Sequence, residues 1–200
     1  MDLLYILDLI GTFVFAISGI RIAAKKDMDL FGASVIGFVT AVGGGTLRDM
    51  LIGSFPVAWI EDPYYPLAIA LAVPFTLILR KYIVHLRRTF FIFDTVGIAL
   101  FTISGMQKAL DYGLHPGLAI MMGMVSAVVG GVIRDTLCNE IPLIFRKEIY
   151  ATACLAGAIA FYIFSLLNIE ANINYLITTG LIIGIRVAAI KFDLSIPKMK

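Results

Sequence analysis

The sequence predicts an all-α membrane protein with seven transmembrane helices, built as two inverted three-helix repeats followed by a seventh helix. Three observations lead to this fold class. Of the 200 residues, 60% are hydrophobic and only 15% are charged, against about 25% charged residues in an average protein. Long apolar segments with few charges recur along the whole chain, and the first half of the chain resembles the second. This composition excludes a soluble domain of the same size.

Seven segments are long and apolar enough to cross the ~30 Å hydrocarbon layer, which takes about 20 helical residues. They lie near residues 3–24, 30–54, 64–84, 89–109, 116–139, 149–168 and 172–190. The first segment follows an acidic Asp2 and has no small-residue cleavage site, so we expect a retained helix rather than a signal peptide. Because the connections are short, we expect one transmembrane domain over residues 1–200. Its parts are repeat one (about 3–86), repeat two (about 89–170) and the seventh helix (about 172–190).

The basic residues predict the orientation, because cytoplasmic connections carry an excess of lysine and arginine. On alternate sides of the membrane, one side collects twelve basic residues and the other has Lys108 alone. The twelve are Arg21, Lys25, Lys26, Arg80, Lys81, Arg87, Arg88, Arg146, Lys147, Lys191, Lys198 and Lys200. We therefore expect a multi-pass protein of the cytoplasmic (inner) membrane, with its amino terminus outside and its carboxyl terminus in the cytoplasm. The expected surroundings are membrane lipid, and no basic patch suggests nucleic acid as a partner.

The two halves align without gaps at an offset of 86 residues. Between positions 6 and 56 the alignment has 19 identities in 51 positions. They include Asp8 with Asp94, and the motif Gly-Gly-x-x-Arg-Asp at residues 44–49 and 130–135. Each repeat holds three helices, so the second copy must enter the membrane from the opposite face. Inverted repeats of this kind are typical of transport proteins, although a duplication can also serve stable packing alone.

Clustered glycines lie past the middle of the second and fifth predicted helices: Gly43, Gly44, Gly45, Gly130 and Gly131. Each glycine weakens a helix by about 1 kcal/mol relative to alanine, so we expect a kink or an unwound turn at both places. Carbonyls freed by such a break need a wet cavity, where they can coordinate a cation. The alternative is a close helix crossing, which small residues permit.

Seven ionisable residues fall inside the predicted spans, where charges usually pair, face a cavity and mark a pathway. They are Asp8, Arg48, Asp49, Asp94, Arg134, Asp135 and Arg186. Their depths predict two ion pairs that brace the helices, Asp8–Arg48 and Asp94–Arg134. Because neighbours on a helix point about 100° apart, Asp49 and Asp135 are expected to turn away from their arginines towards a water path.

The excess of four acids over three arginines favours cations over anions. Arg186 has no counterpart in the other repeat, so it acts either as a tethered positive charge near the inner mouth or as a snorkelling side chain. The two histidines have no other potential metal ligands near them in the sequence. No serine has a nearby residue that could act as a general base. We therefore expect no enzyme activity, no structural metal and no cofactor.

These features together resemble the trimeric intracellular cation (TRIC) channel family in its bacterial and archaeal branch, also catalogued as a glycine-transporter domain. The resemblance covers essentially the whole chain. It implies a homotrimer in which each protomer carries a pore lined by helices two and five, kinked at the glycines listed above. The same resemblance places Arg48, Asp49, Arg134 and Asp135 near the path and implies potassium or sodium as the permeant ion.

Two departures from the family pattern limit what can be transferred. Val129 stands where the first motif has Gly43, so the two breaks need not be equally flexible. Arg-Asp follows the glycines where animal members have a lysine-containing stretch, so animal regulation is not expected here. The sequence leaves two functions open: a passive monovalent cation channel, and an alternating-access transporter of glycine or a similar small zwitterion.

Overall fold

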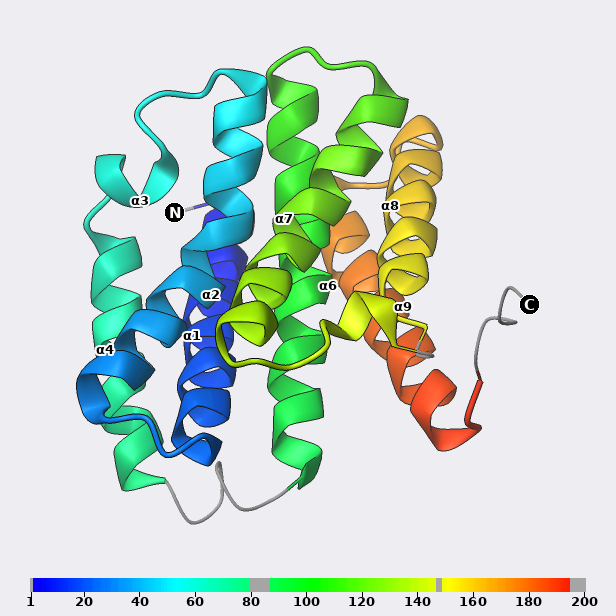
Figure 1. Cartoon of the computed structure of the whole chain (residues 1–200). Coiled ribbons are helices and arrows are strands. Elements are labelled where there is room, and N and C mark those ends of the chain that lie inside the picture. The colour runs from blue at the N-terminus through cyan, green and yellow to red at the C-terminus, as the bar shows by residue number, and fades with distance from the viewer. Residues whose placement is uncertain (1, 80–86, 147–148, 195–200) are drawn as a thin grey trace.

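The computed structural model describes residues 2–79, 87–146 and 149–194, and this part of the chain is helical throughout apart from its connections (Figure 1). Eight α-helices and one 3-10 turn are described. Their bounds are α1 Leu3–Lys25, α2 Leu30–Ile52, α3 Ala58–Glu61, α4 Tyr64–Ile78, α6 Arg87–Asp111, α7 Pro116–Leu137, η1 Leu143–Phe145, α8 Ala151–Leu166 and α9 Ala171–Lys191. The basic residues Arg80, Lys81, Lys147, Lys198 and Lys200, and the end of the third predicted span, lie outside the described residues.

Five of these helices are long and apolar enough to cross a membrane: α1, α2, α6 (over Phe90–Asp111), α7 and α9. Helices α4 and α8 lie where two further spans are expected but are shorter, at 15 and 16 residues. Helix α4 ends at Ile78 and has Pro74 inside it, whereas the sequence predicts a span to residue 84. The chain is thus an all-helical membrane protein, and the count of seven spans stays a prediction.

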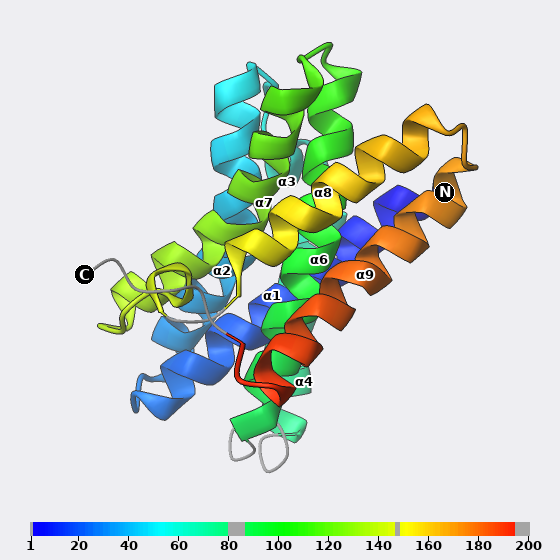
Figure 2. The same ribbon diagram turned by 90° about the vertical axis from the view of Figure 1, so that its right-hand side faces the viewer.

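Helices α1, α2, α6 and α7 form the centre of the molecule. Helix α1 packs on α2 and α6, and α7 packs on α6 and α2. Figures 1 and 2 show α4 against α1 on one side of this centre, and α8 and α9 on the other. The arrangement places the motif-bearing helices α2 and α7 directly against each other.

Small residues allow these central helices to approach closely. A Cβ atom added at Gly19 would lie 2.9 Å from the Cα of Gly37, and one added at Gly105 would lie 3.3 Å from the Cα of Gly123. These two contacts join α1 to α2 and α6 to α7, at positions related by the offset of 86. They are the backbone-to-backbone crossings that small residues make possible in lipid.

The clustered glycines serve the same purpose between α2 and α7. A Cβ at Gly44 would overlap the carbonyl oxygen of Ser126, and one at Gly130 would overlap the carbonyl oxygen of Thr40. Thr40 and Ser126 are themselves 86 residues apart, so the crossing is reciprocal. Close approach therefore explains these two glycines.

The expected unwound turn at the glycines is wrong, because α2 is helical from Leu30 to Ile52 and α7 from Pro116 to Leu137 without a break. Gly43, Gly44, Gly45, Gly130 and Gly131 are all helical. Helix α2 does change direction part-way along its length (Figures 1 and 2). The carbonyls of an intact helix already accept hydrogen bonds, so side chains are the better source of free oxygen ligands here.

Candidate functional site

A cavity of about 220 Å³ opens at the end of the central helices that carries Asp8. Its lining comes from the five helices α1, α2, α3, α4 and α6 and includes Asp2, Tyr5, Asp8, Arg48, Ala58, Tyr65, Ser104, Lys108 and Asp111. A smaller pocket of about 20 Å³ shares part of this wall and reaches Gly45 and Asp49 on α2. The first volume holds several waters and the second about one. The cavity and the pocket share Asp8, Arg48, Ala58 and Tyr65, so together they extend from the surface towards the glycine-containing stretch of α2.

Asp8 is held by neutral donors rather than by an arginine. Its Oδ1 accepts a hydrogen bond from Ser104 Oγ at 2.6 Å, and its Oδ2 accepts one from the hydroxyl of Tyr65 at 2.7 Å. These bonds link α1 to α6 and to α4. Asp8 thus connects α1 to α6 and α4, and not to α2 as predicted.

The predicted Asp8–Arg48 ion pair is wrong, because Arg48 binds its own neighbour instead. Arg48 Nε and Nη2 lie 2.9 and 2.7 Å from Asp49 Oδ1, and its Nη1 lies 3.5 Å from Ser126 Oγ. The long arginine side chain reaches the carboxylate of the next residue, so the 100° between neighbouring Cβ directions does not keep the two charges apart. The expectation that Asp49 turns away from its arginine is wrong for the same reason.

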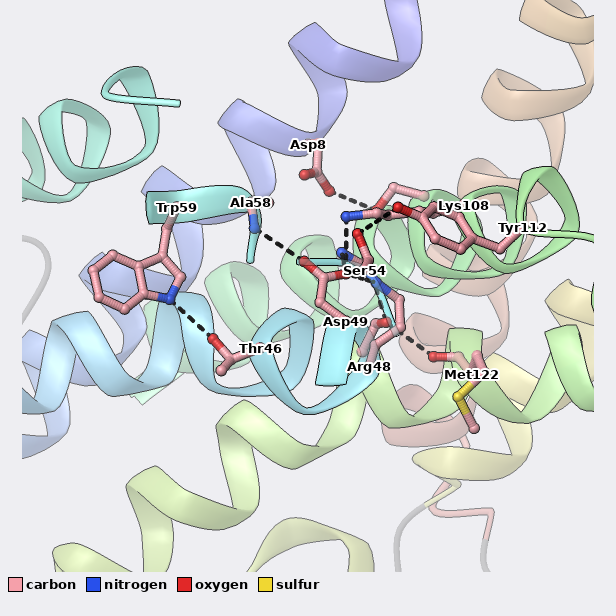
Figure 3. Close-up of polar contacts among 12 residues, drawn as sticks. Asp8, Thr46, Arg48, Asp49, Ser54, Ala58, Trp59, Lys108, Tyr112 and Met122 are labelled. Carbon is pink, nitrogen blue, oxygen red and sulfur yellow. Dashed lines mark hydrogen bonds and ion pairs between the residues drawn. The ribbon is translucent and has the colours of Figure 1, made fainter. Parts of the chain in front are cut away.

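Asp49 is the centre of a buried polar cluster, which Figure 3 shows. Lys108 reaches it from α6, with Nζ 2.9 Å from Oδ1, and the backbone N–H of Ala58 donates to Oδ2 at 3.0 Å. Trp59 beside Ala58 donates to the hydroxyl of Thr46 at 3.1 Å. Asp49 therefore also holds the short helix α3 over α2, and neither α3 nor Lys108 was expected there.

The opposite end of the central helices carries Asp94, and there the predicted ion pair is confirmed. Arg134 Nη1 lies 2.7 Å from Asp94 Oδ1, and the same nitrogen donates to Ser18 Oγ at 2.8 Å. Both side chains are fully buried. The guanidinium also lies over the ring of Phe90, with 4.8 Å from Cζ to the ring centroid.

Asp135 repeats the pattern of Asp49 at this end. Arg134 Nε donates to its Oδ1 at 2.8 Å, and the backbone N–H of Leu143 donates to its Oδ2 at 3.1 Å. The predicted separation of Asp135 from its arginine is therefore also wrong. The two ends differ in the acid on the neighbouring helix: Asp94 is bound by Arg134, whereas Asp8 faces a cavity.

Arg186 is buried in α9, with 1% of the residue exposed. Its Nη1 donates to the carbonyl oxygen of Ile149 at 3.0 Å, and its Cζ lies 4.8 Å from the ring centroid of Tyr150 and 5.1 Å from that of Phe91. A snorkelling side chain would place its charge in water, so that expectation is wrong. The charge is instead enclosed between aromatic rings.

The structure brings together residues that the sequence did not single out as a site. Tyr65, Ser104 and Ser126 complete the cluster at the Asp8 end. Ser104 is part of the repeat, as the equivalent of Ser18, and could have been found there. Lys108 stood out in the sequence as the lone basic residue of the connections on the side predicted to lie outside. Nothing in the sequence predicts its contact with Asp49.

The long apolar helices surround buried charges and an acid-lined cavity, an arrangement expected of a polytopic membrane protein. The family model described as Glycine transporter matches residues 5–81 and 91–165. The inner membrane protein YadS of Escherichia coli (strain K12) is 43% identical over 200 residues, covering 98% of this chain and 95% of that protein.

Two solved structures share the fold over nearly the full length. One is described as the TRIC trimeric intracellular cation channel orthologue from Rhodobacter sphaeroides, with a TM-score of 0.91, 36% identity, and coverage of 97% of this chain and 100% of that chain. The other is described under the structural basis for conductance through TRIC cation channels, with a TM-score of 0.87, 34% identity, and coverage of 100% and 98%. The chain belongs to the TRIC family, to which the glycine-transporter model also refers.

Proposed function

We propose that this protein is a passive cation channel that conducts potassium and sodium along a path lined by α2 and α7. Support comes from the two solved relatives, whose titles name TRIC cation channels and which align with this chain over nearly its whole length. Because α2 and α7 are unbroken, side chains rather than freed carbonyls would line this path.

The observation that carries the proposal is the charge of the cavity at the Asp8 end. Four acids line it or the adjoining pocket, against two bases, Arg48 and Lys108, which leaves a charge of −2. The acids are Asp2, Asp8, Asp49 and Asp111. A concave, negatively charged surface concentrates cations and excludes anions.

The Asp94 end of the central helices has a different role in this proposal. Arg134 and Asp94 form a buried ion pair across α6 and α7, where a hydrated cation would have to pass. Arg48, Asp49, Arg134 and Asp135 then flank the path, while Asp8 and Asp94 brace the helices. In this proposal the described conformation is open to water at the Asp8 end and closed at the Asp94 end.

The assembly and location are part of the proposal. We infer a homotrimer with one pore in each protomer, embedded in lipid of the cytoplasmic membrane, with a transport role rather than an enzymatic one. The TRIC orthologue is described as trimeric and YadS as an inner membrane protein. From the distribution of basic residues we infer that the amino terminus, and with it the Asp8 end, lies outside the cell.

Recording from purified protein in planar bilayers tests the channel directly. A potassium chloride gradient should give unitary currents whose reversal potential follows the cation. Asp8→Asn removes a charge from the cavity and should lower the conductance at low salt. Glu140→Gln removes an exposed charge outside it and is the matched control. Correctly folded protein without unitary current would refute the proposal.

The second candidate is an alternating-access transporter of glycine or a similar zwitterion. The description of the matching family model favours it, and a cavity of about 220 Å³ holding both carboxylates and cationic groups suits a zwitterion. Vesicles loaded with unlabelled glycine distinguish the two functions. Saturable counterflow of labelled glycine without unitary current would establish the transporter, and its absence beside cation-selective currents would exclude it.

A further inference from the structure

We propose that the ammonium group of Lys108 is a tethered cation that occupies a monovalent-cation site at Asp49 and so limits the occupancy of that site by free potassium or sodium. The inference rests on the proposed function, since it concerns the ion that enters the same cavity. The inference adds two points to the proposed function: Asp49 is a binding site for a monovalent cation, and Lys108 is the residue that limits how often that site is occupied.

The geometry places a charged group where an ion would bind. Lys108 Nζ lies 2.9 Å from Asp49 Oδ1, close to the distance of a direct ligand contact. The lysine side chain is 28% exposed and lines the cavity, whereas the Asp49 side chain is 1% exposed. The ammonium thus stands between water and a buried carboxylate. Figure 3 shows Lys108 reaching over Asp49 in this way.

Comparison of the two repeats shows that the fold does not need this ammonium. Lys108 corresponds to Ile22 at the offset of 86 residues. Asp135, the equivalent of Asp49, is held by Arg134 and by the backbone N–H of Leu143 alone among its described partners. Asp49 has the same two kinds of donor in Arg48 and Ala58. Lys108 is therefore a third donor to Asp49, in addition to the two donors that suffice for Asp135.

The charges explain what the addition does. Arg48 already neutralises Asp49, and the described partners of Asp8 are uncharged hydroxyls. Around Asp49, Lys108 is then the counter-charge for Asp8, while Asp2 and Asp111 add further negative charge to the cavity. Without it, a surplus negative charge faces water beside the oxygens of Asp49 and Asp8. Oxygen ligands with a surplus negative charge suit a hard monovalent cation, and a tethered lysine competes with it for the same place.

Lys108→Met tests the site, because methionine keeps a long, flexible side chain without the charge. Thermal unfolding of the purified protein is measured in potassium chloride and in N-methyl-D-glucamine chloride at equal ionic strength. The variant should melt on the order of 3 °C higher in potassium, as expected for a ligand at about ten times its Kd. Wild-type protein should show a much smaller difference.

Three further variants keep the result interpretable. Lys26→Met is the matched control, because Lys26 also forms an ion pair, with Glu140 at 2.7 Å, but outside the cavity. It should show no potassium dependence beyond that of wild type. Adding Asp49→Asn to Lys108→Met should abolish the potassium dependence. Lys108→Gln replaces the methionine variant if that one fails to fold.

Unitary conductance provides the second readout. Lys108→Met should conduct at least about twofold more than wild type at about 0.1 M salt, and the difference should shrink at about 1 M, where charges are screened. A methionine variant that is equally destabilised in both salts, with unchanged or lower conductance, overturns the proposal and leaves Lys108 a structural ion pair. If neither protein conducts, the channel proposal fails, and the melting data alone decide the cation site.

Discussion

Replacing Gly44 by alanine tests whether the glycines serve a close crossing of α2 and α7. The added Cβ would lie 2.9 Å from the carbonyl carbon of Ser126 and would overlap its oxygen. Carbon atoms in contact lie about 3.5–4.0 Å apart, so α2 and α7 would have to separate by roughly 1 Å. Overpacking of this kind costs about 1–3 kcal/mol, which exceeds the helix-propensity gain of up to about 1 kcal/mol from the same change.

Gly45→Ala is the matched control for this prediction. It adds the same methyl group to the next residue of α2, where the nearest atom of the surroundings is Arg48 Nη2 at 3.7 Å, an ordinary contact. The gain in helix propensity then has no opposing clash, so Gly45→Ala should leave the melting temperature unchanged or raise it.

The assay is thermal unfolding of the two purified variants in the same detergent, together with their assembly by size-exclusion chromatography. Gly44→Ala should melt several degrees below Gly45→Ala. Equal melting temperatures, with equal yields of assembled protein, would show that α2 and α7 do not depend on backbone contact at this position. A hinge at the glycines would then again be the better explanation for them.

Two further predictions concern charges at the Asp94 end and at the surface. Asp94→Asn should destabilise the protein by about 3 kcal/mol, because it leaves Arg134 short of a buried partner. Its repeat equivalent Asp8→Asn should cost less than about 1.5 kcal/mol, since hydroxyl donors can still bond to an amide oxygen; comparable losses on unfolding would refute this difference. The hydrogen bond and charge of Lys26 lower the pKa of Glu140. The ion pair therefore stabilises the fold at pH values above the ordinary glutamate pKa. This stabilisation is lost as the pH falls through the lowered pKa of Glu140. Glu140→Gln should therefore lower stability at neutral pH by less than about 1 kcal/mol, because the pair is exposed and screened, and should flatten the acidic limb of a melting-temperature profile; an unchanged limb would contradict it.

The fold was predictable from the sequence because membrane insertion constrains it through composition and length. Five of the expected spans correspond to long apolar helices, and the ends of α1, α7 and α9 lie within two residues of the expected positions. Helix α3 was not predictable by these rules. It is four residues long and is held by the contacts of Ala58 with Asp49 and of Trp59 with Thr46, which no periodicity reveals.

The site was predictable where depth alone decides the contacts. Arg134 and Asp94 lie at the same depth on adjacent helices and do pair. The identical calculation fails for Arg48 and Asp8, because competing partners decide there: Asp49 takes the arginine, and the hydroxyls of Tyr65 and Ser104 take Asp8. Glycine spacing has the same weakness, since it shows where a helix is free to bend or to approach a neighbour but does not distinguish between them.

The Asp8 and Asp94 ends of the central helices also differ in how well their polar atoms are satisfied. In the part of the chain that the structure describes, Asp94 Oδ2, Arg134 Nη2 and the Tyr150 hydroxyl are buried without a hydrogen-bond partner, whereas both carboxylate oxygens of Asp8 are bonded. Each such buried atom costs about 1–3 kcal/mol, and a buried ion pair offsets this only in part. Among the described residues, the Asp94 end therefore carries the less favourable set of contacts. If the protein is the channel proposed above, water admitted at this end would hydrate these atoms and would lower the free-energy cost of separating the ion pair between α6 and α7.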